Sequence, residues 1–142
     1  MAGVTGINHI TLAVADLERS LSFYVEVLGF GLAACWTTGA YLVAGDLWLA
    51  LLVDADRIAH SSADYSHLAF SVRAEDFQEI DERIRENGAI IWQENTSEGD
   101  SLYFLDPDSY KLEIHASDLA ARLEAMARDP KDPTTLIYES EH

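Results

Sequence analysis

Two histidines, His9 and His67, stand at matching places in two stretches of similar sequence, 8–14 and 66–72. Two imidazoles and one carboxylate form a common ligand set for a divalent metal with open coordination positions. Glu113 offers the carboxylate from a predicted strand whose alternate face is apolar. A carboxylate that faces a packed interior is costly unless it is paired or binds a metal. We therefore predict a metal site formed by His9, His67 and Glu113.

Taken singly, these positions leave alternatives open. One histidine in a strand is more often a packed core residue than a ligand, and the matching pair shifts that balance toward metal binding. His115 lies on the face of Glu113 and is the rival third ligand, although it ends its strand. Ligation by nitrogen and oxygen alone suits Mn, Fe, Co, Ni or Zn. His60 and His142 lie in a polar stretch and at the chain end, where we expect solvated side chains.

The elements that position these residues follow the same order twice. The first half predicts a strand over 7–14, a helix from Asp16 to Gly29, and strands near 30–37, 40–44 and 47–53. The second predicts a strand over 66–72, a helix with Phe77, Ile80 and Ile84 on one face that Asn87 and Gly88 close, and strands near 89–94, 101–105 and 110–115. The fold class is therefore α+β, with two βαβββ modules.

Turn residues and polar stretches mark the boundaries between these elements. Gly39 and the pair Gly45-Asp46 signal turns, and Pro107 favours a type I turn over 106–109. We expect a single domain over 4–128, with modules at about 5–53 and 65–116 joined by a polar linker over 54–64. Ser117 is expected to cap a helix over about 117–128, and 129–142 to form an extended or frayed tail.

Composition restricts the partners. The net charge of −16 disfavours nucleic acid and anionic membranes, and an anionic substrate would need a local positive centre such as a metal. The longest apolar runs fall short of a membrane span, and no secretory signal is visible at the start. A single cysteine, Cys35, excludes an internal disulfide and fits a reducing compartment. We expect a cytoplasmic protein.

The segments that contain these residues resemble those of the vicinal oxygen chelate superfamily. Within it, they resemble the FosA-type fosfomycin resistance proteins, which are Mn(II)-dependent glutathione transferases. The resemblance extends from about residue 4 to 128 and is strongest over 8–17, 45–49, 63–67, 97–101, 103–108 and 111–115. The Ser-Glu-Gly-Asp-Ser loop and the Asp-Tyr-x-His run are more specific to this branch than the ligand pattern.

The resemblance implies that His9, His67 and Glu113 bind Mn(II), with His9 from one subunit and the other two ligands from its partner. It implies a domain-swapped homodimer in which the two modules form a cupped mixed sheet around each metal site. It also implies that Thr11 forms a hydrogen bond to the substrate oxygen near the metal.

Further roles follow from the same resemblance. A K⁺ ion is expected in a loop with Ser97, Gly99 and Ser101. The phosphonate substrate is expected to contact Trp48, Tyr65, Ser97, Ser101, Tyr103 and Arg122. The thiol channel is expected to include Trp36, Thr38, Gln93 and Thr96. Without the resemblance, Trp48 would be assigned to the core, Arg122 to a solvated helix face and the serine loop to a polar turn.

Three positions depart from the family pattern. Gln93 and Thr96 stand where the family has a lysine and an arginine, and Thr38 stands where it has a glutamine. We therefore expect weaker use of glutathione. The expected function is metal-dependent addition of glutathione to the epoxide of fosfomycin, which would confer antibiotic resistance. The alternatives are hydration of that epoxide or use of another thiol on the same metal site, and non-catalytic sequestration of a small molecule.

Overall fold

Two four-stranded sheets, each formed by one half of the chain, make up the body of the protein. The structure is a computed structural model that describes residues 1–54, 56 and 63–138. The first module contains β1 (Ile10–Val14), α1 (Leu17–Leu21), the π-helix η1 (Ser22–Val27), β2 (Gly31–Trp36), β3 (Gly39–Ala44) and β4 (Leu47–Val53). The second contains β5 (Leu68–Ser71), the 3₁₀ helix η2 (Ala74–Asp76), α2 (Phe77–Glu86), β6 (Ile91–Gln93), β7 (Ser101–Leu105) and β8 (Lys111–His115), and α3 (Leu119–Arg128) follows. The predicted βαβββ duplication is confirmed.

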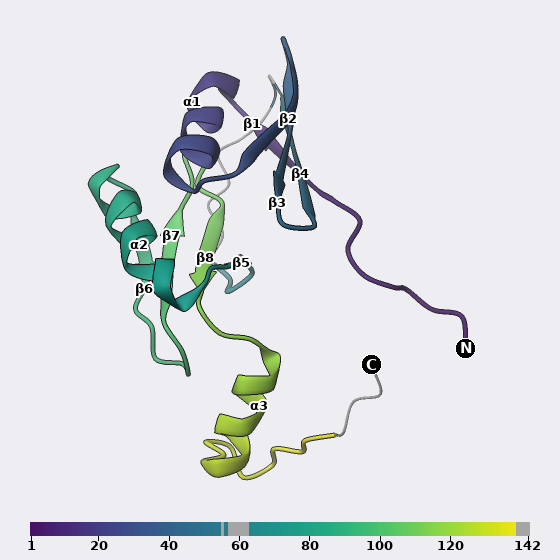
Figure 1. The fold of residues 1–142 in the computed structure, drawn as a ribbon, viewed down its shortest axis with the longest axis vertical. Coiled ribbons are helices and arrows are strands. Elements are labelled where there is room, and N and C mark those ends of the chain that lie inside the picture. Colours follow the sequence, from purple (N-terminus) through teal and green to yellow (C-terminus); the bar gives the residue numbers. More distant parts are fainter. Residues whose placement is uncertain (55, 57–62, 139–142) are drawn as a thin grey trace.

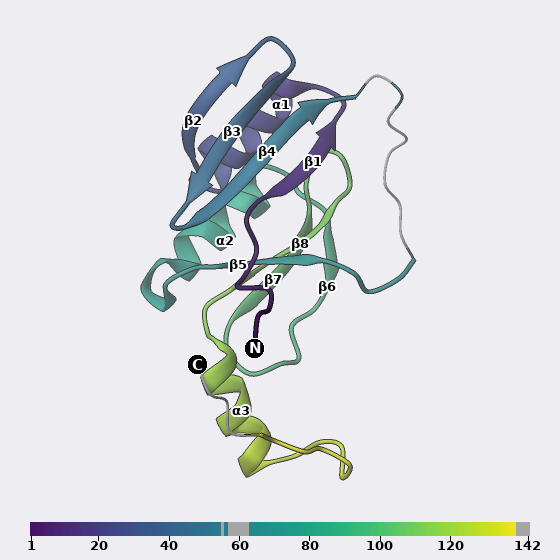
Figure 2. The ribbon, with the colours of Figure 1, turned by 90° about the vertical axis from the view of Figure 1, so that its right-hand side faces the viewer.

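The two sheets have the same topology. Their strand orders are β1-β4-β3-β2 and β5-β8-β7-β6. In each, the first strand pairs parallel with the last and the other pairings are antiparallel. An irregularity occurs at the same place in both, between Leu32 and Ala34 and between Ile91 and Gln93. Figure 2 shows the first sheet above the second, with the exposed face of the first toward the viewer.

The core lies between the sheets and the helices that cover one side of them (Figure 1). Alternate residues face the core, as Leu12 and Val14 of β1 and Leu49 and Leu51 of β4 illustrate, all of them buried. Burial of each such leucine contributes about 1.5–3 kcal/mol. Contacts between aromatic rings join the modules. The ring centroids of Phe23 in η1 and Phe104 in β7 are 6.1 Å apart. The core is therefore continuous through both halves of the chain.

A polar contact between the modules was not foreseen from the sequence. The predicted turn at 106–109 forms, with the Ser109 amide donating to the Asp106 carbonyl at 3.0 Å. Its two carboxylates are buried and accept bonds from the first helix, at 2.7 Å from the Tyr24 hydroxyl to Asp106 and at 3.2 Å from the Ser20 hydroxyl to Asp108. Burial raises the pKa of Tyr24 well above its usual value and also raises the pKa of Asp106. The turn therefore fixes the position of one module against the other.

The residues that signal the start and the end of a helix correctly predicted both ends of the first helix. The Asp16 carboxylate accepts from the Arg19 amide at 3.1 Å as an N-cap, and Gly29 ends the helix with a φ of 85°. The last turns differ from the expectation, because the chain widens into the π-helix η1. The strands at 7–14 and 66–72 are shorter than predicted, so His9 and His67 each lie one residue before a strand.

Two predicted structural roles are wrong. Ser117 does not cap the last helix, because Asp118 caps α3 and the Ser117 hydroxyl donates to Glu98 at 2.6 Å. Gly39 is the first residue of β3 and lies beyond the turn. The absence of a side chain there has another reason, because a Cβ atom would lie 2.7 Å from the Trp36 ring.

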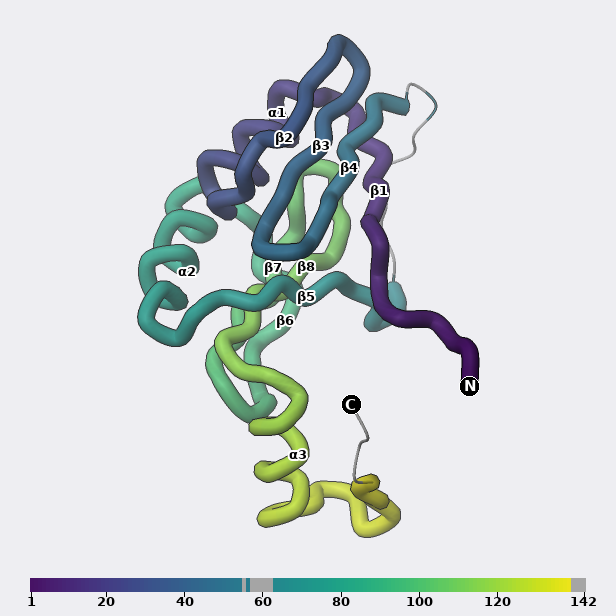
Figure 3. The backbone as a smooth tube through the Cα atoms, turned by 45° about the vertical axis from the view of Figure 1, so that its right-hand side comes forward, coloured from purple at the N-terminus to yellow at the C-terminus, as the bar shows by residue number. Residues whose placement is uncertain are grey.

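Two segments extend away from the sheets. In Figures 1 and 3 the residues before β1 run outward on the side opposite α1 and α2, and α3 projects below both sheets. Val4 and Ile7 are largely exposed in the first segment, and Leu119 is 63% exposed in the second. α3 contains no buried residue. Within 1–54, 56 and 63–138, no helix is long and apolar enough to cross a membrane.

Candidate metal centre and active site

The imidazole of His67 and the carboxylate of Glu113 lie together on the face of the second sheet opposite Leu112 and Ile114, and the Glu113 side chain is buried. His67 Nε2 is 3.0 Å from Glu113 Oε1, and His67 Nδ1 is 2.7 Å from the carbonyl oxygen of Tyr65. A carbonyl oxygen can only accept, so Nδ1 holds a proton, which leaves Nε2 as the ring atom that faces the carboxylate and could bind a metal. Either a proton on Nε2 or a cation bound by both atoms would satisfy a contact of 3.0 Å. The pair therefore fits a divalent metal, with the Tyr65 carbonyl fixing the ring orientation.

His9 lies on the other sheet and does not meet this pair within one chain. Among the residues that the structure describes, no group of three or more His, Cys, Asp or Glu side chains could hold a metal. His9 Nδ1 lies 2.7 Å from Asn8 Oδ1, an acceptor, so its Nε2 atom is also available as a ligand. One chain thus supplies two of the three predicted ligands together and the third separately.

Ser101 and His115 extend the Glu113 side of this site. The Ser101 hydroxyl lies 2.6 Å from Glu113 Oε2 and 2.6 Å from His115 Nδ1. A hydroxyl has one proton, so the arrangement is satisfied when Ser101 donates to the carboxylate and accepts from the imidazole. His115 Nδ1 itself lies 3.6 Å from Glu113 Oε2. Ser101 therefore orients Glu113, and His115 orients Ser101.

Aromatic side chains surround His67. Tyr103 stands opposite Glu113 in the strand register, and its ring lies 5.9 Å from His67 and 5.2 Å from Trp92. Burial raises the pKa of Tyr103, which keeps its hydroxyl protonated and able to donate. The Gln93 side chain donates to the Tyr65 hydroxyl at 2.9 Å. Gln93 thus orients the exposed Tyr65 ring beside this face.

A second aromatic row lies on the exposed face of the first sheet. The Trp48 ring is 4.4 Å from His9 and 5.1 Å from Tyr41, and Tyr41 is 4.8 Å from Trp36. Trp48 Nε1 is buried and, within the described part of the chain, has no hydrogen-bond partner. Thr11 is exposed on the same sheet. This face could form an apolar wall with His9 and the Thr11 hydroxyl at its edge.

Thr38 has a different place. It lies in the turn between β2 and β3, where its carbonyl accepts from the Val53 amide at 2.9 Å. Its backbone thus connects the turn to the end of β4.

The serine loop folds around Asn95, which the sequence did not single out. Asn95 Oδ1 accepts from both the amide and the hydroxyl of Ser97, at 3.0 and 2.9 Å, and its Nδ2 donates to the Gly99 carbonyl at 2.8 Å. Gly99 has a φ of 78°, and a Cβ atom there would lie 2.8 Å from Ser117 Cβ. The loop is therefore compact around the Asn95 side chain.

Arg122 reaches this loop from α3. Its Nε donates to Glu98 Oε2 at 3.3 Å, while Ser117 donates to the other carboxylate oxygen. The Ser117 hydrogen bond, followed by Arg122, lowers the pKa of Glu98. Neither Glu98 nor Ser117 was predicted as a partner, and no local sequence signal identifies the contact.

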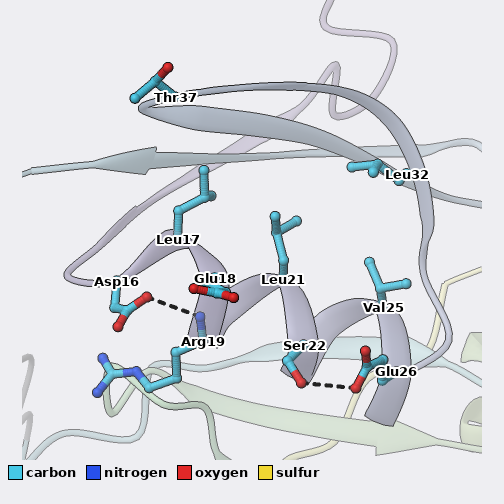
Figure 4. Close-up of a pocket in the computed structure, with 10 residues that line it drawn as sticks. All are labelled: Asp16, Leu17, Glu18, Arg19, Leu21, Ser22, Val25, Glu26, Leu32 and Thr37. Carbon is cyan, nitrogen blue, oxygen red and sulfur yellow. Dashed lines mark hydrogen bonds between the residues drawn. The ribbon is translucent and has the colours of Figure 1, made fainter.

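Two cavities lie near these elements. One of about 530 Å³ lies between the serine loop and α3 and is lined by Thr96, Ser97 and Arg122, among others. Another of about 780 Å³ lies between the first helix and β2 (Figure 4). It is lined by apolar side chains such as Leu17 and Leu21 and contains none of the predicted site residues. The first cavity thus brings predicted residues from separate elements together.

Comparison with known proteins gives consistent matches. Residues 6–114 match the Glyoxalase/Bleomycin resistance protein/Dioxygenase superfamily. The chain is 50% identical over 126 residues to glutathione transferase FosA of Serratia marcescens, covering 87% of this chain and 89% of that protein. It is 37% identical over 128 residues to metallothiol transferase FosB of Staphylococcus epidermidis, covering 85% and 88%.

Solved structures match as well. The fosfomycin resistance protein FosX of Listeria monocytogenes, complexed with Mn(II) and 1S,2S-dihydroxypropylphosphonic acid, has a TM-score of 0.76 and 28% identity. The match covers 87% of this chain and 98% of that one. FosX of Mesorhizobium loti matches with a TM-score of 0.73 and 30% identity, covering 85% and 99%.

Proposed function

The chain belongs to the Glyoxalase/Bleomycin resistance protein/Dioxygenase superfamily, and from that premise we propose that it adds glutathione to the epoxide of fosfomycin. The product would be a thioether that no longer has the strained ring, so the reaction would confer resistance. The single observation that supports this most is the His67–Glu113 pair, whose Nε2 and Oε1 atoms lie 3.0 Å apart, close enough to bind one divalent cation. We propose that the reaction takes place in the cytoplasm, because glutathione is kept reduced there.

His9, His67 and Glu113 are proposed to hold the metal, preferentially Mn(II), across two copies of the chain. His9 belongs to one copy, and the other two ligands belong to its partner. Two observations support an exchange of modules: both histidines present Nε2 on exposed sheet faces, and large apolar side chains are exposed on the projecting segments. Exposed apolar surface of this kind is typical of an interface. A metal in this site would act as a Lewis acid toward the phosphonate and epoxide oxygens.

The chain's own residues would bind and orient the substrate. Arg122 and the hydroxyls of Ser97, Ser101, Tyr65 and Tyr103 are proposed to hold the phosphonate, because a dianion needs cationic and hydroxyl donors. Ser97 and Ser101 would turn their hydroxyl protons to the phosphonate from Asn95 and Glu113. Arg122 would then donate with the guanidinium hydrogens that Glu98 does not accept. Trp48 would pack against the carbon skeleton. These contacts would place an epoxide carbon in line for attack.

Thr11 is proposed to assist ring opening. The thiol sulfur attacks an epoxide carbon, the carbon–oxygen bond breaks, and its electron pair stays on the oxygen. The Thr11 hydroxyl would donate a hydrogen bond to that oxygen as its negative charge develops. The thiol proton leaves to solvent, and the oxygen takes up a proton from solvent, so no side chain forms a covalent bond to substrate.

Two further sites complete the proposal. The compact serine loop would hold K⁺ through oxygens of Ser97, Gly99 and Ser101, near the phosphonate. Glutathione would enter past Trp36 and Thr38 of one copy and Gln93 and Thr96 of the other. The last two are uncharged, so the chain would bind the thiol with fewer ionic contacts.

Product analysis tests this function. Purified protein with Mn(II), K⁺, glutathione and fosfomycin should give the glutathione adduct by mass spectrometry. A diol without thiol would indicate hydration, and stoichiometric protection of the drug without turnover would indicate sequestration. The face of the first sheet around Thr11 disfavours hydration, because its outward residues on β1, β3 and β4 include no carboxylate to activate water: Thr11, Ala13, Tyr41, Val43, Trp48, Ala50 and Leu52.

A further inference from the structure

Trp92 has no role in the proposed reaction, yet it lies at the irregular point of β6. Ile91 of this strand pairs with Phe104 of β7. Two residues later, Gln93 pairs with Tyr103, which is the very next residue of β7. Trp92 is therefore the extra residue of a β-bulge. Bulges of this kind redirect a side chain and are frequent beside active sites.

The bulge turns Trp92 onto the face of the second sheet that carries the His67 imidazole. In a regular strand, Ile91 and Gln93 would face the same side, because side chains two residues apart do. Here Ile91 packs against the core, whereas the Gln93 side chain bonds to the Tyr65 hydroxyl on the other face. The Trp92 ring lies on that face too, with 5.4 Å between its centroid and that of His67. The bulge thus places two consecutive side chains beside the candidate metal site.

The indole of Trp92 is anchored to the backbone of the two neighbouring strands. Its Nε1 atom donates to the carbonyl oxygens of Phe104 in β7 and Leu112 in β8, at 3.1 Å each. An indole N–H can only donate, so the two carbonyls share its one proton. The Lys111 ammonium lies over the ring, 5.3 Å from the centroid, as a cation–π contact. The ring is therefore fixed at its polar edge and on one face.

This anchored ring acts on both members of the candidate ligand pair. It meets the His67 imidazole edge-on, with 60° between the ring planes, an orientation that aromatic pairs favour. The polar contact that holds the same imidazole comes from the Tyr65 carbonyl, which lies before β5 and outside the sheet. The Leu112 carbonyl that accepts from the indole belongs to the peptide unit that joins Leu112 to Glu113. Trp92 thus limits the rotation of the His67 ring and the movement of the Glu113 backbone.

The first module has the same bulge with a small residue in it. The irregularity between Leu32 and Ala34 leaves Ala33 as the extra residue of β2. The imidazole of His9 lies instead against the ring of Trp48 in β4, with 4.4 Å between centroids. An indole therefore lies beside the histidine in each module, although it comes from a different strand. This recurrence favours a role for the indole at the histidine over a role in the bulge itself.

We infer that Trp92 is a positioning residue that holds His67 Nε2 and Glu113 Oε1 at the separation needed to bind one metal ion. The inference rests on the proposed function, because it assumes that this pair binds the metal. Groups that orient metal ligands in this way change metal affinity without touching the metal. The indole would act through two routes, the ring contact with His67 and the N–H bond to the Leu112 carbonyl.

Two substitutions separate these routes. Trp92→Phe keeps an aromatic ring beside His67 and removes the N–H donor, whereas Trp92→Leu removes both. The Mn(II) affinity, measured by calorimetry without substrate, should fall by about tenfold for Trp92→Phe and further for Trp92→Leu, within the range of about 10–100-fold for groups that orient metal ligands. The visible absorption spectrum of the Co(II)-loaded protein reports the geometry of the ligands, and it should change in both variants.

Phe70→Leu is the matched control, because it shortens an aromatic side chain of the same sheet on the opposite face. Phe70 pairs with Ile114 of β8, and its ring lies 5.3 Å from Phe30 in the core. This control should lower the melting temperature and leave the Mn(II) affinity and the Co(II) spectrum of the folded protein unchanged. The same pattern in Trp92→Phe and Trp92→Leu would overturn the inference. If Trp92→Leu did not fold, an unchanged Mn(II) affinity in Trp92→Phe would overturn it alone. Absence of Mn(II) binding in the wild type would instead reject the proposed function.

Discussion

His67 and Glu113 face each other through Nε2 and Oε1 at 3.0 Å, while the Tyr65 carbonyl fixes a proton on the other ring nitrogen. The contact joins residues 46 positions apart in the sequence. Its geometry suits a cation between or beside the two groups. The charge of Glu113 is therefore the property to remove.

Glu113→Gln keeps the shape of the side chain and removes that charge. We expect the Mn(II) affinity to fall by about 100-fold or more, because changing even the groups that only orient the ligands costs about 10–100-fold. Calorimetric titration measures this directly. Glu94→Gln, which neutralises an exposed carboxylate after β6, is the control and should leave the affinity unchanged. Equal affinities in both variants would remove Glu113 from the ligand set.

The sequence predicted those features that depend on neighbours in the chain. The alternation of Leu49 and Leu51 with outward residues, the Asp16 cap and the Gly29 terminus all follow from local chemistry, and they appear in the structure. The repeat of the first half in the second predicted that the two modules share one order of elements, and their sheets have the same strand order. The matching histidines pointed to a shared role because the repeat gives them equivalent positions.

The sequence could not predict contacts between distant side chains. Asp108 is 88 residues from Ser20, and Ser117 is 19 residues from Glu98, so no spacing rule connects either pair. Ser117 resembled a helix cap because a serine before an apolar repeat usually is one. Asp118, the next residue, caps the helix instead, and the Ser117 hydroxyl donates to Glu98.

Restoring the missing cations tests the thiol-binding side. Gln93→Lys with Thr96→Arg should lower the KM for glutathione by about tenfold or more, since a charge-assisted hydrogen bond contributes about 1.5–3 kcal/mol. Gln93 now donates to the Tyr65 hydroxyl at 2.9 Å, and a lysine there retains a donor. Gln78→Lys on α2 is the control, because it adds a charge far from the site in the helix layer. An unchanged KM would show that these two positions do not limit glutathione binding.

The buried carboxyl of Asp106 gives a pH dependence of stability. Burial raises its pKa above the ordinary 3.8, so the folded state holds the proton more strongly than the unfolded state. As the pH rises from about 3.8 through the pKa of Asp106 in the folded state, Asp106 ionises and the free energy of unfolding of the wild type falls. At low pH, Asp106→Asn should be less stable by about 1 kcal/mol because the hydrogen bond from Tyr24 is weakened.

The free-energy gap between Asp106→Asn and the wild type should then narrow as the pH rises, because asparagine does not titrate. Urea unfolding at several pH values measures it. Asp132 is the control of opposite sign, because hydrogen bonds from Thr134 lower its pKa. The free-energy gap between Asp132→Asn and the wild type should therefore widen as the pH rises through the acid range. A gap that stays constant for Asp106→Asn would contradict the assignment.

Complementation tests whether the site is shared. His9→Ala and Glu113→Ala should each be inactive alone. In a mixed dimer, one site receives both substitutions and the other receives neither, because His9 and Glu113 belong to different copies. Co-expression should therefore restore about one quarter of the wild-type activity, since about half of randomly formed dimers are mixed and each has one intact site.

A second mixture controls for this restoration. His67→Ala with Glu113→Ala should stay inactive, because both residues belong to the same half-site and each mixed site lacks one of them. Their proximity within one chain, at 3.0 Å, requires that outcome. If the first mixture also stayed inactive while mixed dimers were present by mass spectrometry, His9 would not act with the partner's Glu113. The metal would then need a different third ligand, and His115, 3.6 Å from Glu113 in the same chain, would be the residue to substitute next.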